Sequence, residues 1–432
     1  MSQQKKNWMA IIMMVALFAM IAFVTNLCNP MAVIVKNQFG ASNFLAQLGN
    51  SANFIAYLLM GIPSGLLITK YGYKKTALLA IALGIIGVLV QYMSGWGSIQ
   101  SFFVYLIGAL ISGFCMCMLN AVVNPMLNTL GGGGNTGNQL IQFCGVFNSL
   151  AAVAVTILMG SMIGDPTTAQ ISAATPALFI ALGIFVLAFV VLFFSKIPEP
   201  QQAKAAEKDK NDKHSAFSFR HFNLGILAIF LYIGLEVGVP TYINQFLTSS
   251  QTAATPGMGM DAGIAGTIVA MYWLMMLIGR FIGGAIGAKV SSRTQISVVA
   301  SLAIILILIG MFAPTDVMLP MLGFNGSEGT FATADIPVGM FALVFVGLCT
   351  SVMWGGIFNL AVEGLGKYTA IASGAFMTMV CGGAVIVPIQ GLIADWTGSF
   401  LTSYVVVLIC VVYILFYALV GSKNVNKDIK VD

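Results

Sequence analysis

The sequence predicts an all-α membrane protein of twelve transmembrane helices in two pseudo-symmetric six-helix bundles. Of its 432 residues, 59% are hydrophobic and only 8% are charged, and long apolar stretches recur between short polar breaks. A water-soluble fold of this composition would have too few charges for its surface. A helix needs about 20 mainly apolar residues to cross the hydrocarbon core, and it bonds its own backbone groups within the segment.

The apolar stretches place six spans near 8–34, 44–69, 75–95, 101–128, 139–163 and 175–195. Six more follow near 222–247, 262–288, 295–313, 337–361, 370–393 and 401–421. These stretches are continuous, unlike the short alternating segments of a membrane β-barrel. The first is longer than the apolar part of a secretion signal and no cleavage pattern follows it, so we expect a retained helix.

The cysteines and histidines indicate neither a metal site nor a cofactor. The seven cysteines all fall inside predicted spans, their number is odd, and no CxxC pair occurs. Both histidines, His214 and His221, lie in or beside the one long polar stretch. We therefore expect buried cysteines that pack as small hydrophobes, and no enzyme active site.

Basic residues occupy alternate loops, which predicts the orientation of the chain. Lysines and arginines cluster before span one, after spans two and eight, in the central loop and at the end of the chain, whereas the opposite loops carry mainly acids; Lys36 is the exception. The positive-inside rule makes the basic side cytoplasmic. We expect a multi-pass protein of a bacterial inner (plasma) membrane with both termini in the cytoplasm. The net charge of +5 then reflects topology, and no nucleic-acid partner is expected.

A hydrophilic stretch at 197–221 divides the chain into halves. We expect bundles at 1–196 and 222–421, a cytoplasmic linker at 197–221 and a cytoplasmic tail at 422–432. The halves echo each other, because Gly61-x3-Gly65-x4-Lys70 after span two corresponds to Arg280-x3-Gly284-x4-Lys289 after span eight. Parallel repeats of this kind are typical of one large class of secondary transporters.

Specific motifs resemble a known family. The segment Gly65-Leu-Leu-Ile-Thr-Lys70-Tyr-Gly72-Tyr-Lys74-Lys75 resembles the loop 2–3 signature of the major facilitator superfamily, which usually has Asp at the position of Thr69. Further motifs resemble its fucose/glucose/galactose permease subfamily, a group of sugar:cation symporters: Asn26-Leu-Cys-Asn29, Asn43-Phe44, Gly49-Asn50-Ser51-Ala52, Asn124-Pro125, Phe147-Asn148-Ser149, Tyr232-Ile-Gly-Leu-Glu236-Val, Tyr272-Trp273, Ile278-Gly-Arg280-Phe-Ile-Gly283, Phe358-Asn359-Leu-Ala-Val-Glu363-Gly-Leu-Gly-Lys367 and Gly382-Gly383-Ala384. The resemblance implies the major facilitator fold and transport of a monosaccharide.

Polar and aromatic side chains inside the spans are the candidates for substrate binding. Asn120, Asn124 and Asn128 are spaced four residues apart, which places three amides on one helical face. Amides both donate and accept hydrogen bonds, as sugar hydroxyls do, and flat rings suit the C–H face of a pyranose. The predicted set is Asn26, Asn29, Asn50, Asn53, Asn120, Asn124, Gln142, Asn148, Tyr242, Asn244, Tyr272, Trp273, Trp354 and Asn359. We expect them to share a water-accessible cavity halfway through the membrane; the alternative for each amide is a helix–helix hydrogen bond.

Glu236 is the only carboxylate near the middle of a span, so it must be protonated, paired or in contact with water. We predict that it is the coupling residue, with a structural hydrogen bond as the alternative. Proton-coupled members of the resembled family carry an acid in span one and a Glu or Gln in span four, where this chain has Asn29 and Asn120. Coupling of H⁺ or Na⁺ through Glu236, coupling through Na⁺ held by carbonyls and amides, and the absence of coupling all stay open.

Charges near the cytoplasmic ends of spans predict a gate made of Lys70, Lys74, Arg280, Glu363 and Lys367. We expect Arg280 to extend toward the membrane surface or to act in the gate. Glu363 and Lys367 are four residues apart, a spacing that suits an ion pair at a helix end.

Together these features predict a monomeric secondary transporter that imports a neutral monosaccharide, a hexose or deoxyhexose such as fucose, glucose or galactose, by alternating access. The chain has no P-loop for ATP. An anionic substrate would need buried cations, and only Arg280 and Lys36 come close. A carrier of another small organic solute and a sugar sensor that does not transport stay open as alternatives.

Overall fold

The computed structural model describes residues 8–39, 43–97, 99–163, 170–195, 197, 214–260, 262–325, 330–426, 428–429 and 431. Within these ranges it describes no side chains at 28–30, 32–33, 36–37, 43–47, 50, 156–163, 173, 262–263, 323–325 and 331–332. Most of the predicted linker, including 198–213, therefore lies outside the described residues.

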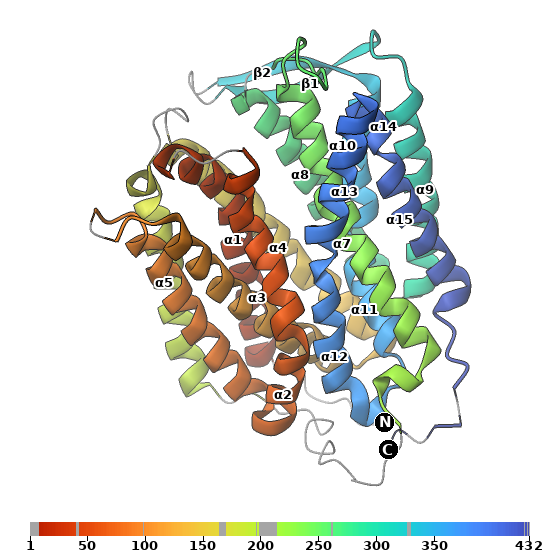
Figure 1. Cartoon of the computed structure of the whole chain (residues 1–432). Helices are drawn as coiled ribbons and strands as arrows, with labels where there is room; N and C mark the ends of the chain where they lie inside the picture. Colours follow the sequence, from red (N-terminus) through yellow and green to blue (C-terminus); the bar gives the residue numbers. More distant parts are fainter. Residues whose placement is uncertain are drawn as a thin grey trace.

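The helices that precede the linker lie together on one side of the molecule (Figure 1). They are α1 (Trp8–Phe39), α2 (Asn43–Met93), α3 (Phe102–Leu130), α4 (Gly134–Ile163) and α5 (Ile171–Phe194). The 51-residue α2 joins two helices across Gly72, whose φ of 84° and ψ of 171° are not helical. Glycine tolerates this conformation because it has no Cβ. The chain therefore turns at the point where the sequence predicts the end of one span and the start of the next.

The helices that follow the linker form the other side of the molecule (Figure 1). They are α7 (Arg220–Thr248), α8 (Ala262–Ile286), α9 (Ser292–Phe312), α10 (Val338–Thr350), α11 (Met353–Val362), α12 (Thr369–Thr378), α13 (Gly382–Thr397), α14 (Phe400–Ser403) and α15 (Val405–Phe416). Short helical turns, η1 to η4, lie at Ala216–Ser218, Gly366–Tyr368, Met379–Cys381 and Tyr417–Gly421. Among the described residues, 11 helical segments are long and apolar enough to cross a membrane, which confirms the prediction of a polytopic helical protein.

A small β-hairpin interrupts the helical fold. Strands β1 (Met318–Asn325) and β2 (Thr330–Pro337) pair antiparallel, with Met318 opposite Pro337. The hairpin lies at the end of the molecule far from the beginning of α7 (Figure 1). The sequence predicts a loop between two spans here, so the all-α prediction holds for the spans and not for this connection.

The two groups of helices pack together at the end where α5 stops and α7 begins, which we call the linker side. There α2 lies against α12 without room for side chains: a Cβ at Gly61 would overlap Thr378, and one at Gly65 would lie 2.9 Å from the carbonyl oxygen of Ala370. Small residues let membrane helices approach this closely. The linker side is thereby closed by direct contact between the two groups.

Candidate functional site

Polar side chains meet where α3 and α4 of the first group face α8 and α11 of the second. The indole Nε1 of Trp354 donates to Asn124 Oδ1 at 3.1 Å. Asn128 Nδ2 donates to Asn359 Oδ1 at 3.1 Å. Neutral amides and one indole thus bridge the two groups, and each bridge consists of groups that can also bond a hydroxyl.

A second pair of amides, both on α4, reaches across the same interface. Gln142 Nε2 donates to the carbonyl oxygen of Val352 at 3.0 Å, at the short break between α10 and α11. Gln139 Nε2 donates to the carbonyl oxygen of Gly284 on α8 at 2.9 Å. These bonds connect the groups through backbone carbonyls: that of Gly284 lies in the last turn of α8, and that of Val352 also accepts from the backbone N–H of Gly356 at 3.1 Å.

The amide stack on α3 forms as the sequence predicts. Asn120 is buried, and its Nδ2 donates to the hydroxyl of Tyr57 at 2.8 Å and to the carbonyl oxygen of Met116 at 3.2 Å. One turn on, Asn124 Nδ2 donates to the carbonyl oxygen of Asn120 at 2.9 Å. The stack is therefore one polar stripe that runs along α3 to the interface. Each of its amides has a hydrogen-bond partner within the protein.

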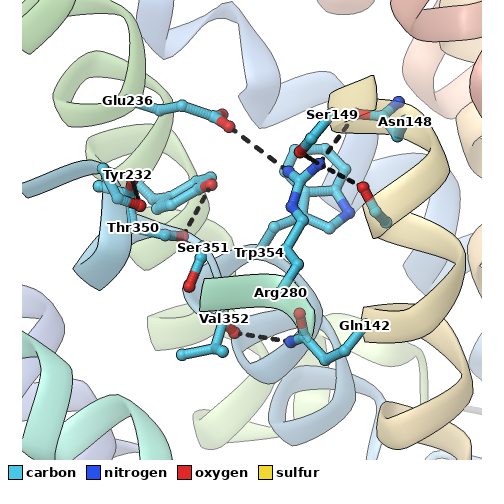
Figure 2. Close-up of polar contacts among 12 residues, drawn as sticks. Gln142, Asn148, Ser149, Tyr232, Glu236, Arg280, Thr350, Ser351, Val352 and Trp354 are labelled. Atoms are coloured by element: carbon cyan, nitrogen blue, oxygen red, sulfur yellow. Dashed lines mark hydrogen bonds and ion pairs between the residues drawn. The ribbon is translucent and has the colours of Figure 1, made fainter. Parts of the chain in front are cut away.

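The centre of the site is an ion pair between neighbouring helices α7 and α8. Arg280 Nη2 lies 3.8 Å from Glu236 Oε1 (Figure 2), and the two side chains are only 9% and 15% exposed. A carboxylate or a guanidinium without a partner is costly inside a membrane, and this pairing lowers that cost. The expectation that Arg280 extends toward the membrane surface is wrong, because its side chain is buried and points to the interface.

The other arm of Arg280 reaches the first group. Its Nη1 lies 3.0 Å from the carbonyl oxygen of Gly145, 3.0 Å from Asn148 Oδ1 and 2.8 Å from Ser149 Oγ, all on α4 (Figure 2). Asn148 in turn donates from Nδ2 to the carbonyl oxygen of Phe18 on α1 at 2.8 Å. One arginine therefore connects the only carboxylate in the middle of a span with α4 of the opposite group.

Buried and partly buried aromatic residues lie beside this pair in the second group. Tyr272 Oη lies 3.1 Å from Thr350 Oγ1 and donates to the carbonyl oxygen of Glu236 at 3.3 Å. Trp273 contacts the ring of Tyr272 edge-on, with centroids 5.3 Å apart. The ring of Trp354 lies between Tyr232 and Phe376, with centroid distances of 6.2 and 6.1 Å. The site thus has aromatic walls beside its amides.

Several predicted site residues lie away from this centre. Tyr242 donates to the carbonyl oxygen of Val387 within the second group, and Asn244 is exposed. Asn26 donates to the carbonyl oxygen of Ala22 on its own helix, whereas Asn53 is buried on α2. The side chains of Asn29 and Asn50 lie outside the described residues.

Arg280 lies at the centre of the site, and the other four predicted gate charges occupy several separate places on the linker side. Lys74 donates from Nζ to the carbonyl oxygens of Phe193 and Ser195 at the end of α5, and Lys70 lies over the ring of Tyr71. Glu363 and Lys367 do not lie on successive turns of one helix, which corrects the predicted helical spacing. Helix α11 ends at Val362, and Gly364 and Gly366 between them adopt positive φ. A gating role for these residues stays a prediction.

Some residues that complete the site are absent from the predicted set. Tyr57 accepts from Asn120, and Thr350 lies beside Tyr272; a lone hydroxyl inside an apolar span gives no periodic signal. Ser149 was visible as part of a family motif beside Asn148. Gly145 gives no signal in the sequence. In the structure it leaves room for Arg280, because a Cβ at this position would lie 3.1 Å from Cδ of the arginine.

Comparisons with known proteins agree with this architecture. The profile of the Major Facilitator Superfamily matches residues 12–388. The chain is 29% identical over 429 residues to a glucose/galactose transporter of Brucella abortus, covering 98% of this chain and 96% of that protein. It is 30% identical over 439 residues to a putative glucose/galactose transporter of Helicobacter pylori, covering 98% and 99%.

Among solved structures, the crystal structure of the fucose:proton symporter of Escherichia coli matches with a TM-score of 0.75 at 22% identity. The match covers 96% of this chain and all of that one. It indicates a shared fold. With the family profile covering most of the sequence, the chain belongs to the Major Facilitator Superfamily.

Proposed function

We propose that this protein is a secondary active transporter that imports a neutral monosaccharide, a hexose or deoxyhexose such as fucose, glucose or galactose, by alternating access. The observation that carries the proposal is the make-up of the interface between the helix groups, where the indole of Trp354 and the amide of Asn124 meet at 3.1 Å. The relatives named as glucose/galactose transporters support the choice of substrate class.

The chemistry of the interface favours an uncharged, hydroxyl-rich substrate. Asn120, Asn124 and Gln142 each offer donors and an acceptor, and the Trp354 ring offers a flat apolar face. The one buried arginine, Arg280, is already matched by Glu236, so the described interface has no spare cation for an organic anion. We infer that the predicted cavity opens between these side chains when the groups separate.

We infer that cation coupling passes through Glu236. Its partner Arg280 holds α4 of the other group through Asn148 and Ser149, so a change of charge at Glu236 would alter the bonds between the groups. The relative named as a fucose:proton symporter favours H⁺ over Na⁺. No metal ion or organic cofactor belongs to this proposal.

We also infer twelve spans in two bundles of six, at 1–196 and 222–421, with the linker at 197–221 and the tail at 422–432. The break at Gly72 supports counting α2 as two spans. The basic loops favour a cytoplasmic linker side, with both termini in the cytoplasm of a bacterial cell, and a monomer suffices for this mechanism. On that basis the closed linker side corresponds to an outward-facing arrangement.

Uptake of labelled sugars into proteoliposomes tests the proposal. Glucose, galactose and fucose are compared with a charged sugar acid, each with and without imposed H⁺ and Na⁺ gradients. Accumulation of a neutral sugar above equilibrium under one gradient supports it. Binding without uptake would identify a sensor, and accumulation of the acid alone would identify a carrier of another solute class.

A further inference from the structure

The chain after η4, which we call the tail, folds back over the linker side of the second helix group and returns toward the beginning of α7 (Figure 1). Ser422 is buried, and its Oγ accepts from Nε of Arg293 on α9 at 3.2 Å. Farther along, Ile429 and Val431 are partly buried and pack against the hydrophobic core. The described residues of the tail, 422–426, 428–429 and 431, therefore belong to the folded second group.

The middle of the tail binds the beginning of α7. Asn426 Oδ1 accepts from the backbone N–H of Arg220, the first residue of that helix, at 3.0 Å. The first N–H groups of a helix have no partner within it, and the preceding residue, Phe219, has no side-chain oxygen that could serve as a cap. Asn424 Oδ1 accepts from the N–H of Asn426 at 3.0 Å and so holds the tail in a turn here. The tail supplies the cap that the local sequence of α7 lacks.

The end of the tail binds the turn that leads into α12. The carbonyl oxygen of Val431 accepts from the backbone N–H of Lys367, in η2, at 3.0 Å. The neighbouring Gly366 has a φ of 46°, and a Cβ at this position would overlap the carbonyl oxygen of Val431. Glycine therefore permits both the left-handed turn and the close approach of the tail.

Helix α12 depends on such contacts because it is not continuous with its neighbours. Gly364 and Gly366 have positive φ between α11 and α12, and η3 separates α12 from α13. Irregular backbone at the two ends of a helix can act as a hinge. The same helix closes the linker side against α2, where Gly61 and Gly65 leave no room for side chains. Contacts this close are lost after a small displacement, so α12 must be held firmly in place.

We propose that the tail is a latch that holds α12 against α2 and thereby favours the closed linker side. It ties the turn before α12 to the beginning of α7, which limits the movement of that turn. When the tail detaches, the backbone around Gly364 and Gly366 is free to bend and α12 can separate from α2. This inference rests on the proposed alternating access, because a latch acts only where the linker side opens.

Spin-label distance measurements on the purified full-length protein test the latch without any sugar present. Labels at Lys75→Cys and Lys289→Cys, both exposed on the linker side, report the separation of the two helix groups. We expect Asn426→Ala, which removes the cap of α7, to raise the fraction of molecules at the longer distance about twofold or more. Removal of residues 423–432, which keeps Ser422, should raise it further. Val425→Ser, a change at a tail side chain that is 56% exposed, is the matched control and should leave the distances unchanged.

The latch is overturned if Asn426→Ala and the folded truncated protein both keep the wild-type distance distribution. If the truncated protein does not fold, Asn426→Ala and Ile429→Asp decide the question in its place. An equal shift in Val425→Ser and Asn426→Ala would also overturn it, because the specific contacts of the tail would then be irrelevant. These distances are measured without sugar, whereas a failure of the proposed transport function would appear as missing uptake by the wild type in proteoliposomes.

Discussion

Arg280 and Glu236 form a buried ion pair of 3.8 Å between α8 and α7, and the same guanidinium bonds to α4 of the opposite helix group. The pair therefore belongs to one half of the protein, while its hydrogen bonds extend into the other. An ion that binds at Glu236 would compete directly for the residue that joins the two halves. This relationship yields the first two predictions.

Glu236→Gln should uncouple transport from the ion gradient. The amide keeps the size of the side chain but cannot carry a charge, so Arg280 would stay bonded to α4 whatever the gradient. We expect gradient-driven accumulation to be lost while exchange of labelled for unlabelled sugar continues. Asp335→Asn, an exposed change in β2, is the matched control. Accumulation that persists in Glu236→Gln would show that the carboxylate has a structural role.

Arg280→Gln should destabilise the protein more than the double change Arg280→Gln with Glu236→Gln. Removing one partner strands the other charge at a cost of about 3 kcal/mol, whereas removing both leaves two neutral amides. Thermal unfolding of the purified variants measures the difference. Equal melting temperatures for the single and the double variant would mean that Arg280 does not stabilise a charged Glu236.

Asn120→Ala should lower sugar uptake at least about tenfold while the protein still reaches the membrane. The change removes the donor to Tyr57 and interrupts the polar stripe on α3. Asn223→Ala, which alters an exposed amide on the linker side, serves as the control. Wild-type uptake by Asn120→Ala would move the substrate site away from α3.

Asn138→Leu should stabilise the closed linker side and slow transport. Asn138 on α4 is 1% exposed, and among the described residues neither polar atom of its amide has a hydrogen-bond partner. Such a group costs about 1–3 kcal/mol, which an apolar side chain of similar size would recover. We expect a higher melting temperature together with slower uptake. A lower melting temperature would show that the amide is satisfied in the folded protein.

The spans could be predicted because lipid imposes one requirement on all of them. Each must be a continuous apolar helix, and this pattern is visible in the sequence without any knowledge of packing. The hairpin at Met318–Pro337 lies in a connection between two spans, where this requirement does not apply. Its strands were therefore not predicted.

The site could be predicted only in part, because sequence spacing describes one helix at a time. The stack of Asn120, Asn124 and Asn128 follows from helical periodicity, and the structure has it. The partner of Glu236 lies 44 residues away on another helix, and no periodicity relates the two. The predicted spacing of Glu363 and Lys367 failed because it assumes a continuous helix, which ends at Val362.

The central claim is that sugar binds between the helix groups, against the amide of Asn124 and the ring of Trp354. Isothermal titration of the purified protein with glucose, galactose and fucose tests it most directly, using wild type, Asn124→Ala and Trp354→Ala. We predict that wild type binds at least one of these sugars and that each variant loses about tenfold or more in affinity. Wild-type affinity in both variants would contradict the claim.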